Sequence, residues 1–352
     1  MEQKRIGAMI GRCVLLLTDK CNASCKYCLQ GSHEYNRIAN RADYDIDKVV
    51  SSIPKNTEIE IQFFGGEPLL EFHTMIEVAY KIKSMNPKAF FRTITNGILL
   101  TKDKVNKLNE LDFGVLISHD GKHHKSLRGY DDILTTNPEL FVGLKNRSFA
   151  TTATSVNYDF YEIWDYFSNE AIRLGFKPSE FPCKINIIED CGSTDKSLMI
   201  YNHSGFEAML EQVFCNMTKE IKSGNFSCDE FIQNASLIET LYGRISGKQK
   251  ISPMCGYDFT TLTLDLAGNL YHCPNVFSKT GSINTRGFKA GKFNPYIHTL
   301  ACQNCEALLL CGGGCTASPS SSKHYDCYIK KLQYKLLMKF LNDCSGGISC
   351  KI

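Results

Sequence analysis

The sequence predicts an α/β protein built around a parallel β-sheet. The first observation is that apolar, strand-like segments alternate with helix-like segments through the first two thirds of the chain. The second is the length of 352 residues, which is enough for a sizeable core or two domains. The third is an ordinary globular composition, with 43% hydrophobic and 22% charged residues.

The strand-like segments alternate apolar and polar residues or form a short apolar run. In chain order they cover residues 13–17, 58–64, 90–95, 113–118, 149–155 and 184–188. The helix-like segments have apolar residues at helical spacing and cover 46–53, 70–85, 101–111 and 158–174. Pro54 and Pro87 follow the first two helices, and Thr101 opens the third. Six strands, most with a helix between them, predict right-handed crossovers. The periodicity does not decide between an open doubly wound sheet and a full or partial barrel.

Composition excludes several classes of protein. The net charge of +3 gives no reason to expect a nucleic-acid binder. The chain shows no basic segment followed by an apolar segment and a cleavage site. No apolar run approaches the roughly 18 residues that a membrane helix needs. We therefore expect a cytoplasmic protein with no membrane and no nucleic-acid partner.

Cysteine is the anomalous residue, because 17 cysteines in a reducing compartment indicate metal or redox chemistry. Three of them, Cys21, Cys25 and Cys28, form a C-x3-C-x2-C loop directly after the first strand. Three thiolates can bind three irons of a [4Fe–4S] cluster and leave the fourth iron free for a small chelating molecule. The alternative is zinc, which prefers four ligands and could take His33 as the fourth.

This spacing, with the aromatic Tyr27 before the third cysteine, resembles the signature of the radical S-adenosylmethionine (SAM) superfamily. The resemblance implies a partial (β/α)6 barrel of the TIM type. It also implies that the open iron binds the amino and carboxylate groups of SAM, and that one electron cleaves SAM to a 5′-deoxyadenosyl radical. The backbone of Tyr27 would lie near the adenine.

Gly65, Gly66, Glu67 and Pro68 follow the second strand and match the SAM-amine motif of that superfamily. Glycines let a backbone approach a ligand closely, and the Glu67 carboxylate would complement the ammonium group. The alternative is an ordinary Gly-rich turn between a strand and a helix. Asn96, Ser118 and Asp120 end the third and fourth strands, where a ribose or carboxylate would sit. Asn-Gly and Asp-Gly are also common turn dipeptides.

A second array of seven cysteines lies towards the C-terminus: Cys255, Cys273, Cys302, Cys305, Cys311, Cys315 and Cys327. Their spacings resemble those of the SPASM domain, which carries auxiliary [4Fe–4S] clusters. The resemblance assigns Cys255, Cys273 and Cys315 to the first auxiliary cluster and the other four to the second. The fourth ligand of the first cluster is Cys228 or another unassigned cysteine, or else one iron is open. Two zinc sites are the alternative.

The segment 260–272 reads as a β-hairpin with a turn at Gly268, which would bring Cys255 and Cys273 together. We therefore expect two domains, a radical SAM partial barrel over 1–225 and a SPASM domain with a C-terminal helix over 226–352. The cofactors implied are three [4Fe–4S] clusters, one binding SAM and two auxiliary, and SAM itself.

The function implied is abstraction of hydrogen from a peptide or protein, which installs a thioether, a carbon–carbon crosslink or a related oxidation in a ribosomally made peptide. The alternative in the same superfamily is formylglycine formation, as in anaerobic sulfatase maturases. That group has an acidic base directly after the Gly-x4-Cys cysteine. Here Pro274 follows Cys273, so Asp190 or His272 would have to act instead. Outside this class, the chain could be an iron–sulfur electron-transfer protein or a zinc-bound scaffold.

The partners implied are the peptide substrate and an external electron donor. Twenty residues precede Cys21, so we expect no leader-binding domain before the cluster loop. A leader peptide would then bind the barrel itself or a separate leader-binding protein. The basic segment 122–128 is a candidate surface for it, with an ordinary solvated loop as the alternative.

Overall fold

A computed structural model describes residues 11–30, 38–190, 195–224, 261–271, 273–275, 279–284, 302, 304–311 and 323–345. The described strands form one sheet, in the order β6-β5-β4-β3-β2-β1-β7-β8-β9. The first six are β1 (Arg12–Thr18), β2 (Ile59–Gly65), β3 (Ala89–Thr95), β4 (Gly114–Ser118), β5 (Asn146–Ala153) and β6 (Cys183–Ile187). They are parallel and lie in chain order. The predicted α/β class and all six predicted strands are therefore confirmed, with ends that differ by a few residues.

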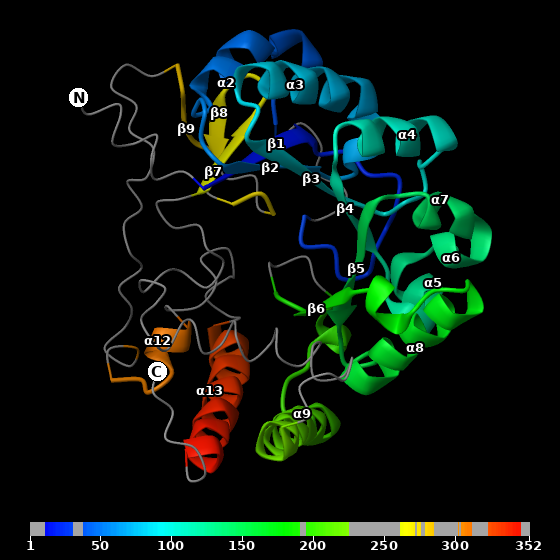
Figure 1. The fold of residues 1–352 in the computed structure, drawn as a ribbon. Coiled ribbons are helices and arrows are strands. Elements are labelled where there is room, and N and C mark those ends of the chain that lie inside the picture. The colour runs from blue at the N-terminus through cyan, green and yellow to red at the C-terminus, as the bar shows by residue number, and fades with distance from the viewer. Residues whose placement is uncertain are drawn as a thin grey trace.

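The helices that connect these strands lie along the outer side of the curved sheet (Figure 1). They are α2 (Ile46–Ser52), α3 (Phe72–Met85), α4 (Lys102–Glu110), α5 (His124–Arg128), α6 (Ile133–Thr136), α7 (Pro138–Val142) and α8 (Phe160–Arg173). The short α5, α6 and α7 were not predicted, since four or five residues are too few to show a helical period. Within the described residues β6 and β9 are the two edges of the sheet, so the barrel is partial.

Helix starts follow the local chemistry of the sequence. The side chain of Thr101 accepts a hydrogen bond from Lys104 N at 3.3 Å and caps α4, as predicted. Asp159 caps α8 in the same way. The helix predicted over 70–85 instead begins with a 3₁₀ turn at Pro68–Glu71, followed by α3.

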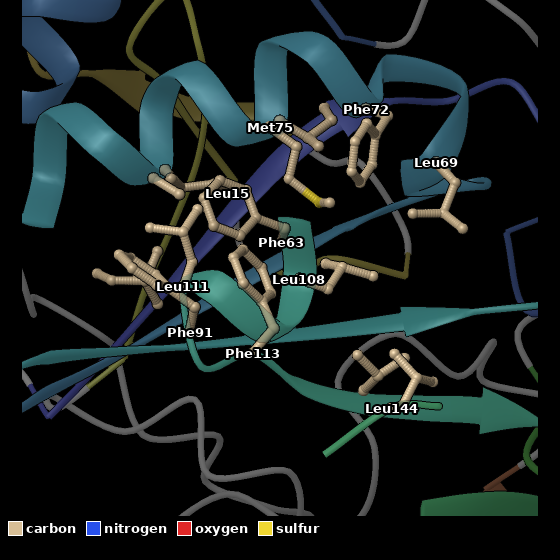
Figure 2. Packing of buried hydrophobic residues seen from close by; sticks show 14 of the residues in the cluster. Leu15, Phe63, Leu69, Phe72, Met75, Phe91, Leu108, Leu111, Phe113 and Leu144 are labelled. Atoms are coloured by element: carbon tan, nitrogen blue, oxygen red, sulfur yellow. The ribbon is translucent and has the colours of Figure 1, made fainter. Parts of the chain in front are cut away.

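The main core lies between the sheet and the outer helices. Alternate strand residues point towards the helices, and Phe63, Phe91 and Phe113 form a stacked group with ring centroids 5.2 to 6.1 Å apart. Figure 2 shows these rings packed beneath α3, with Met75 of that helix against them. This packing fixes the strands from the outer side, so their carboxyl ends meet at one edge.

Three more strands, β7 (Thr261–Asp265), β8 (Asn269–Tyr271) and β9 (Lys279–Ser282), extend the sheet beyond β1. β7 and β8 form the predicted antiparallel hairpin, and Gly268 in its turn has a φ of +80°. The sequence did not reveal that β7 pairs with β1 in parallel, with Val14 opposite Thr263. A segment from the far side of the expected boundary at 225/226 is thus part of the barrel sheet.

A second core packs helix α9 (Ser204–Ser223) against helix α13 (Lys323–Ser345), which is the predicted C-terminal helix. Phe214 and Phe340 meet edge to face at 6.0 Å, and Tyr328 donates to Glu207 Oε1 at 2.6 Å. Tyr325 donates to Ile188 O at 2.9 Å, just after β6. The C-terminal helix is therefore attached to the β6 edge of the sheet. None of the described helices is both long enough and apolar enough to cross a membrane.

Candidate functional site

The cysteine loop lies at the carboxyl end of β1, and hydrogen bonds from several elements hold it. Lys20 N donates to Thr18 Oγ1 at 3.1 Å, and Cys28 N donates to Cys25 O at 3.1 Å. Lys26 N donates to Leu127 O of α5 at 2.9 Å, which ties the loop to the segment after β4. These hydrogen bonds fix the loop to β1 and to the segment that follows β4.

Sulfur atoms of this loop receive N–H groups from the protein. Ala23 N donates to Cys21 Sγ at 3.4 Å, and Asn96 Nδ2 lies 4.0 Å from the same sulfur. Arg128 Nη1 lies 3.9 Å from Cys25 Sγ. Hydrogen bonds to sulfur are the usual surroundings of cluster-binding thiolates. The donor set around the loop therefore fits an iron–sulfur cluster.

Burial raises the pKa of Cys25 to about 11, although the charge of Arg128 opposes this rise. Burial also raises the pKa of Cys21, and the charges of Glu67 and Cys28 add to the effect. These thiols are therefore protonated at neutral pH until iron binds, so cluster assembly releases protons. Within the described residues, no three His, Cys, Asp or Glu side chains are arranged to hold a metal ion.

Gly65 and Gly66 lie against the backbone of the cysteine loop. Gly66 N donates to Thr18 O and Glu67 N donates to Lys20 O, both at 2.8 Å. A Cβ on Gly65 would lie 2.2 Å from Thr18 O, and one on Gly66 would lie 2.1 Å from Lys20 O. The two glycines were expected to let the backbone approach a ligand closely. In the structure, the backbone that they approach is that of the cysteine loop. Contact of these glycines with SAM stays a prediction.

Glu67 is buried, and its carboxylate is occupied by protein donors. It accepts hydrogen bonds from Leu69 N at 3.0 Å, Thr95 Oγ1 at 2.7 Å and Asn96 N at 2.8 Å. Burial raises the pKa of Glu67, and these three donors oppose the rise. Asn96 in turn donates through Nδ2 to Asn22 Oδ1 of the loop at 2.7 Å. Glu67 therefore positions Asn96 against the cysteine loop, and its expected contact with the SAM ammonium stays a prediction.

Asp120 and Tyr27 are buried together beneath the loop. Asp120 has no exposed surface and accepts from the Tyr27 hydroxyl and from Thr152 N, the latter at 3.1 Å. Arg128 Nη2 donates to Asp120 Oδ1 at 3.2 Å, and its Nε lies 2.8 Å from Oδ2. The Asp120 carboxylate therefore has protein partners on both oxygens. Ser118, the last residue of β4, is half-buried at the same edge of the sheet, and its contact with SAM stays a prediction.

The basic segment 122–128 is not the solvated loop of the alternative reading, and its role as a surface for a leader peptide stays a prediction. Lys122 and Lys125 are exposed and pair with Glu162 at 2.5 Å and Asp131 at 2.9 Å. The rest of the segment forms a 3₁₀ turn and α5, in which His124, Leu127 and Arg128 are buried. The sequence did contain a signal for this burial. Leu127 is an apolar residue within a basic segment, and Arg128 stands directly beside it.

The C-terminal cysteines are described in part, because Cys255 and Cys315 lie outside the described residues. Asn275 N donates to Cys273 Sγ at 3.4 Å. Cys305 N donates to Cys302 O at 3.1 Å, in the turn before α12 (Leu308–Cys311). Cys327 lies on α13, which contacts α12. Gln30 Nε2 donates to Pro274 O at 3.3 Å, which joins the segment after Cys273 to the end of the cluster loop.

Comparisons with known proteins agree with this site. A family model described as a 4Fe-4S single cluster domain matches residues 9–134, which contain the cysteine loop. The radical SAM cyclopropyl synthase TigE of Paramaledivibacter caminithermalis is 26% identical over 97% of this chain and 76% of that protein. A cysteine-type anaerobic sulfatase-maturating enzyme of Clostridium novyi is 24% identical, with 85% of each chain covered.

Two solved structures share the fold. Native anSMEcpe with bound AdoMet superposes with a TM-score of 0.69 at 19% identity, over 95% of this chain and 99% of that one. Streptococcus suis SuiB bound to precursor peptide SuiA superposes with a TM-score of 0.58 at 16% identity, over 90% of this chain and 74% of that one. The chain is thus similar in sequence to radical SAM enzymes of the maturase type over most of its length, and it shares their fold.

Proposed function

We propose that this protein is a peptide maturase that forms a carbon–carbon or thioether bond in a ribosomally made peptide. The observation that carries the proposal is the cysteine loop, held at the carboxyl edge of an open sheet by N–H donors to its sulfur atoms. A bound cluster and SAM would supply a 5′-deoxyadenosyl radical that removes a hydrogen atom from the substrate carbon. Cys21, Cys25 and Cys28 would hold the cluster, and the Gly65–Pro68 segment, Asn96, Ser118 and the Tyr27 backbone would hold SAM.

Two relatives support a peptide substrate. SuiB was solved with a precursor peptide, and TigE is named a cyclopropyl synthase. Ring closure and crosslinking both remove two hydrogen atoms from the substrate. One leaves with the deoxyadenosyl group, and the other leaves as a proton and an electron. A maturase of this kind therefore needs an electron acceptor near the substrate, and an external donor to reduce the first cluster.

The C-terminal cysteines would hold that acceptor as two auxiliary clusters. We assign Cys255, Cys273 and Cys315 to one and Cys302, Cys305, Cys311 and Cys327 to the other. Supporting this, three of the second set lie in and before α12 and the fourth lies on α13, in contact with it. The hydrogen bond from Gln30 to Pro274 also brings the segment after Cys273 to the end of the first cluster loop.

The first test counts iron and sulfide after anaerobic reconstitution. We expect about twelve irons per chain, since each cube holds four. The variant with Cys21, Cys25 and Cys28 changed to Ala should hold about eight and no longer cleave SAM. About four irons in the unaltered protein would contradict the two auxiliary clusters. Zinc bound by the C-terminal cysteines would show that these residues form zinc sites instead.

The second test uses synthetic peptides encoded by short genes beside this one. Incubation with SAM and a reductant should give 5′-deoxyadenosine and a peptide lighter by two hydrogen atoms, with no aldehyde. An aldehyde trapped by a hydrazide would instead support the formylglycine reaction, which the relative from Clostridium novyi makes the second candidate. Against that candidate, Pro274 follows Cys273 and the buried Asp190 pairs with Lys196.

A further inference from the structure

Arg128 is a buried cation that faces a sulfur of the cluster loop. Its residue surface is 7% exposed, and Nη1 lies 3.9 Å from Cys25 Sγ. Arginine is almost never buried unless it is paired, because removing a charge from water is costly. The pair here is with Asp120, which has no exposed surface.

The orientation of Arg128 is set from several sides. Two of its nitrogens engage the two Asp120 oxygens, at 2.8 Å for Nε and 3.2 Å for Nη2. Asp120 is itself held by Thr152 N and by the Tyr27 hydroxyl. The guanidinium carbon lies 5.4 Å from the centre of the Tyr27 ring. With those contacts made, the remaining nitrogen, Nη1, points to the sulfur of Cys25.

The half-buried Arg147 shows what a purely structural role looks like in the same protein. Arg147 Nη1 donates to Val142 O at 3.3 Å and Leu144 O at 2.9 Å, and its guanidinium lies over phenylalanine rings. It thus caps the carbonyls at the end of α7. Arg128 has a carboxylate on one side and a thiol on the other, an arrangement that places the positive end of an ion pair towards the sulfur.

We propose that Arg128 sets the reduction potential of the cluster bound by Cys21, Cys25 and Cys28. Reduction adds a negative charge to the cluster, and a nearby cation that donates N–H to a ligand sulfur stabilises the reduced form. Arg128 thereby raises the potential and makes the cluster easier to reduce. The negative charge of Asp120 partly offsets the positive charge of Arg128. The same carboxylate fixes the direction in which the Arg128 Nη1–H group points. The inference depends on the cluster of the proposed function.

The experiment measures the midpoint potential of this cluster by electron paramagnetic resonance in the absence of SAM. The full-length protein is reconstituted, and the signal of the variant lacking Cys21, Cys25 and Cys28 is subtracted to remove the auxiliary clusters. Arg128→Gln should shift the potential to a more negative value. Arg128→Lys keeps the charge and should shift it less. The matched control is Lys125→Gln, which removes the same charge from an exposed side chain of the same helix and should not shift it.

The opposite charge change gives an independent check. Asp120→Asn removes the partner carboxylate and should shift the potential to a more positive value, because the arginine charge is then uncompensated. An unchanged potential in Arg128→Gln at full iron content would overturn the proposal. If Arg128→Gln fails to retain the cluster, a negative or absent shift in Asp120→Asn would overturn it. Absence of the first cluster from the unaltered protein would instead refute the proposed function.

Discussion

At the residue scale, the backbone of Gly66 lies against the cysteine loop with no room for a side chain. A Cβ there would be 2.1 Å from Lys20 O and 2.5 Å from Lys20 C, which are backbone atoms. We predict that Gly66→Ala displaces the loop, lowers the iron content and destabilises the protein by about 1–3 kcal/mol, the usual cost of an inserted group that forces the backbone to shift. Denaturant unfolding and iron analysis measure both effects.

Gly11→Ala is the matched control for Gly66→Ala, because nothing lies within 4 Å of the Cβ that it would add. It should leave iron content unchanged. Equal iron content and equal stability in the two variants would show that the loop yields to a Cβ, contrary to the prediction.

His124 is a buried histidine whose two ring nitrogens have no hydrogen-bond partner among the described residues. Its ring lies 4.6 Å from that of His119 and 4.7 Å from that of Tyr130. Burial, and then the neighbouring charges of His119 and Arg128, lower the pKa of His124 from 6.5 to about 3. The folded protein therefore keeps this ring neutral under conditions in which the unfolded chain protonates it.

A lowered pKa means that the unfolded state binds more protons between pH 6.5 and pH 3, so the contribution of His124 to stability falls as pH falls through this window. We predict that His124→Phe is at least as stable as the unaltered protein at pH 8. Between pH 8 and pH 5.5, one unit below 6.5, the free energy of unfolding of the variant should rise by about 1.4 kcal/mol relative to that of the unaltered protein. Urea unfolding at the two pH values measures this. A difference independent of pH would contradict the assignment.

At the element scale, α9 and α13 form one packed pair although about 100 residues separate them along the chain. Phe214 and Phe340 are both buried in this contact. We predict that either Phe→Ala change costs about 3–5 kcal/mol of unfolding free energy, because each leaves a cavity. The double variant should cost less than the sum by about 1 kcal/mol, the usual coupling of an aromatic pair. Thermal or urea unfolding of the four proteins provides the cycle, and strict additivity would show that the two rings do not interact.

At the scale of the whole molecule, the sheet is continuous across the expected domain boundary. β7 covers the edge of β1, and Leu262, Leu264, Leu266 and Leu270 belong to the main core. An uncovered β1 would present unpaired backbone groups and apolar side chains, which favours aggregation. We predict that residues 1–224 expressed alone lack cooperative unfolding and aggregate. Co-expression of residues 225–352 should restore a soluble complex. Cooperative unfolding of the fragment close to that of the full chain would show that the barrel folds independently.

Much of the fold was predictable from the sequence, because it depends on local patterns. The six parallel strands follow from apolar alternation, and the start of α4 follows from the hydroxyl of Thr101. The β7–β8 hairpin was predictable because a turn with Gly268 pairs neighbouring segments. The parallel pairing of β7 with β1 was not predictable, because the residues between two distant parallel strands contain no local pattern that indicates their pairing.

The sequence by itself determined the place of the cysteine loop and predicted its chemistry, because the spacing of Cys21, Cys25 and Cys28 along the chain limits which metal centres they can share. It also determined that Gly65–Pro68 follows the next strand and so meets that loop at the same edge of the sheet. Only the tertiary structure decided that Glu67 holds Asn96, and that Arg128 turns inward to Asp120 and Cys25. Those contacts join residues far apart in the chain, and they exist because neighbouring strands bring their carboxyl ends together.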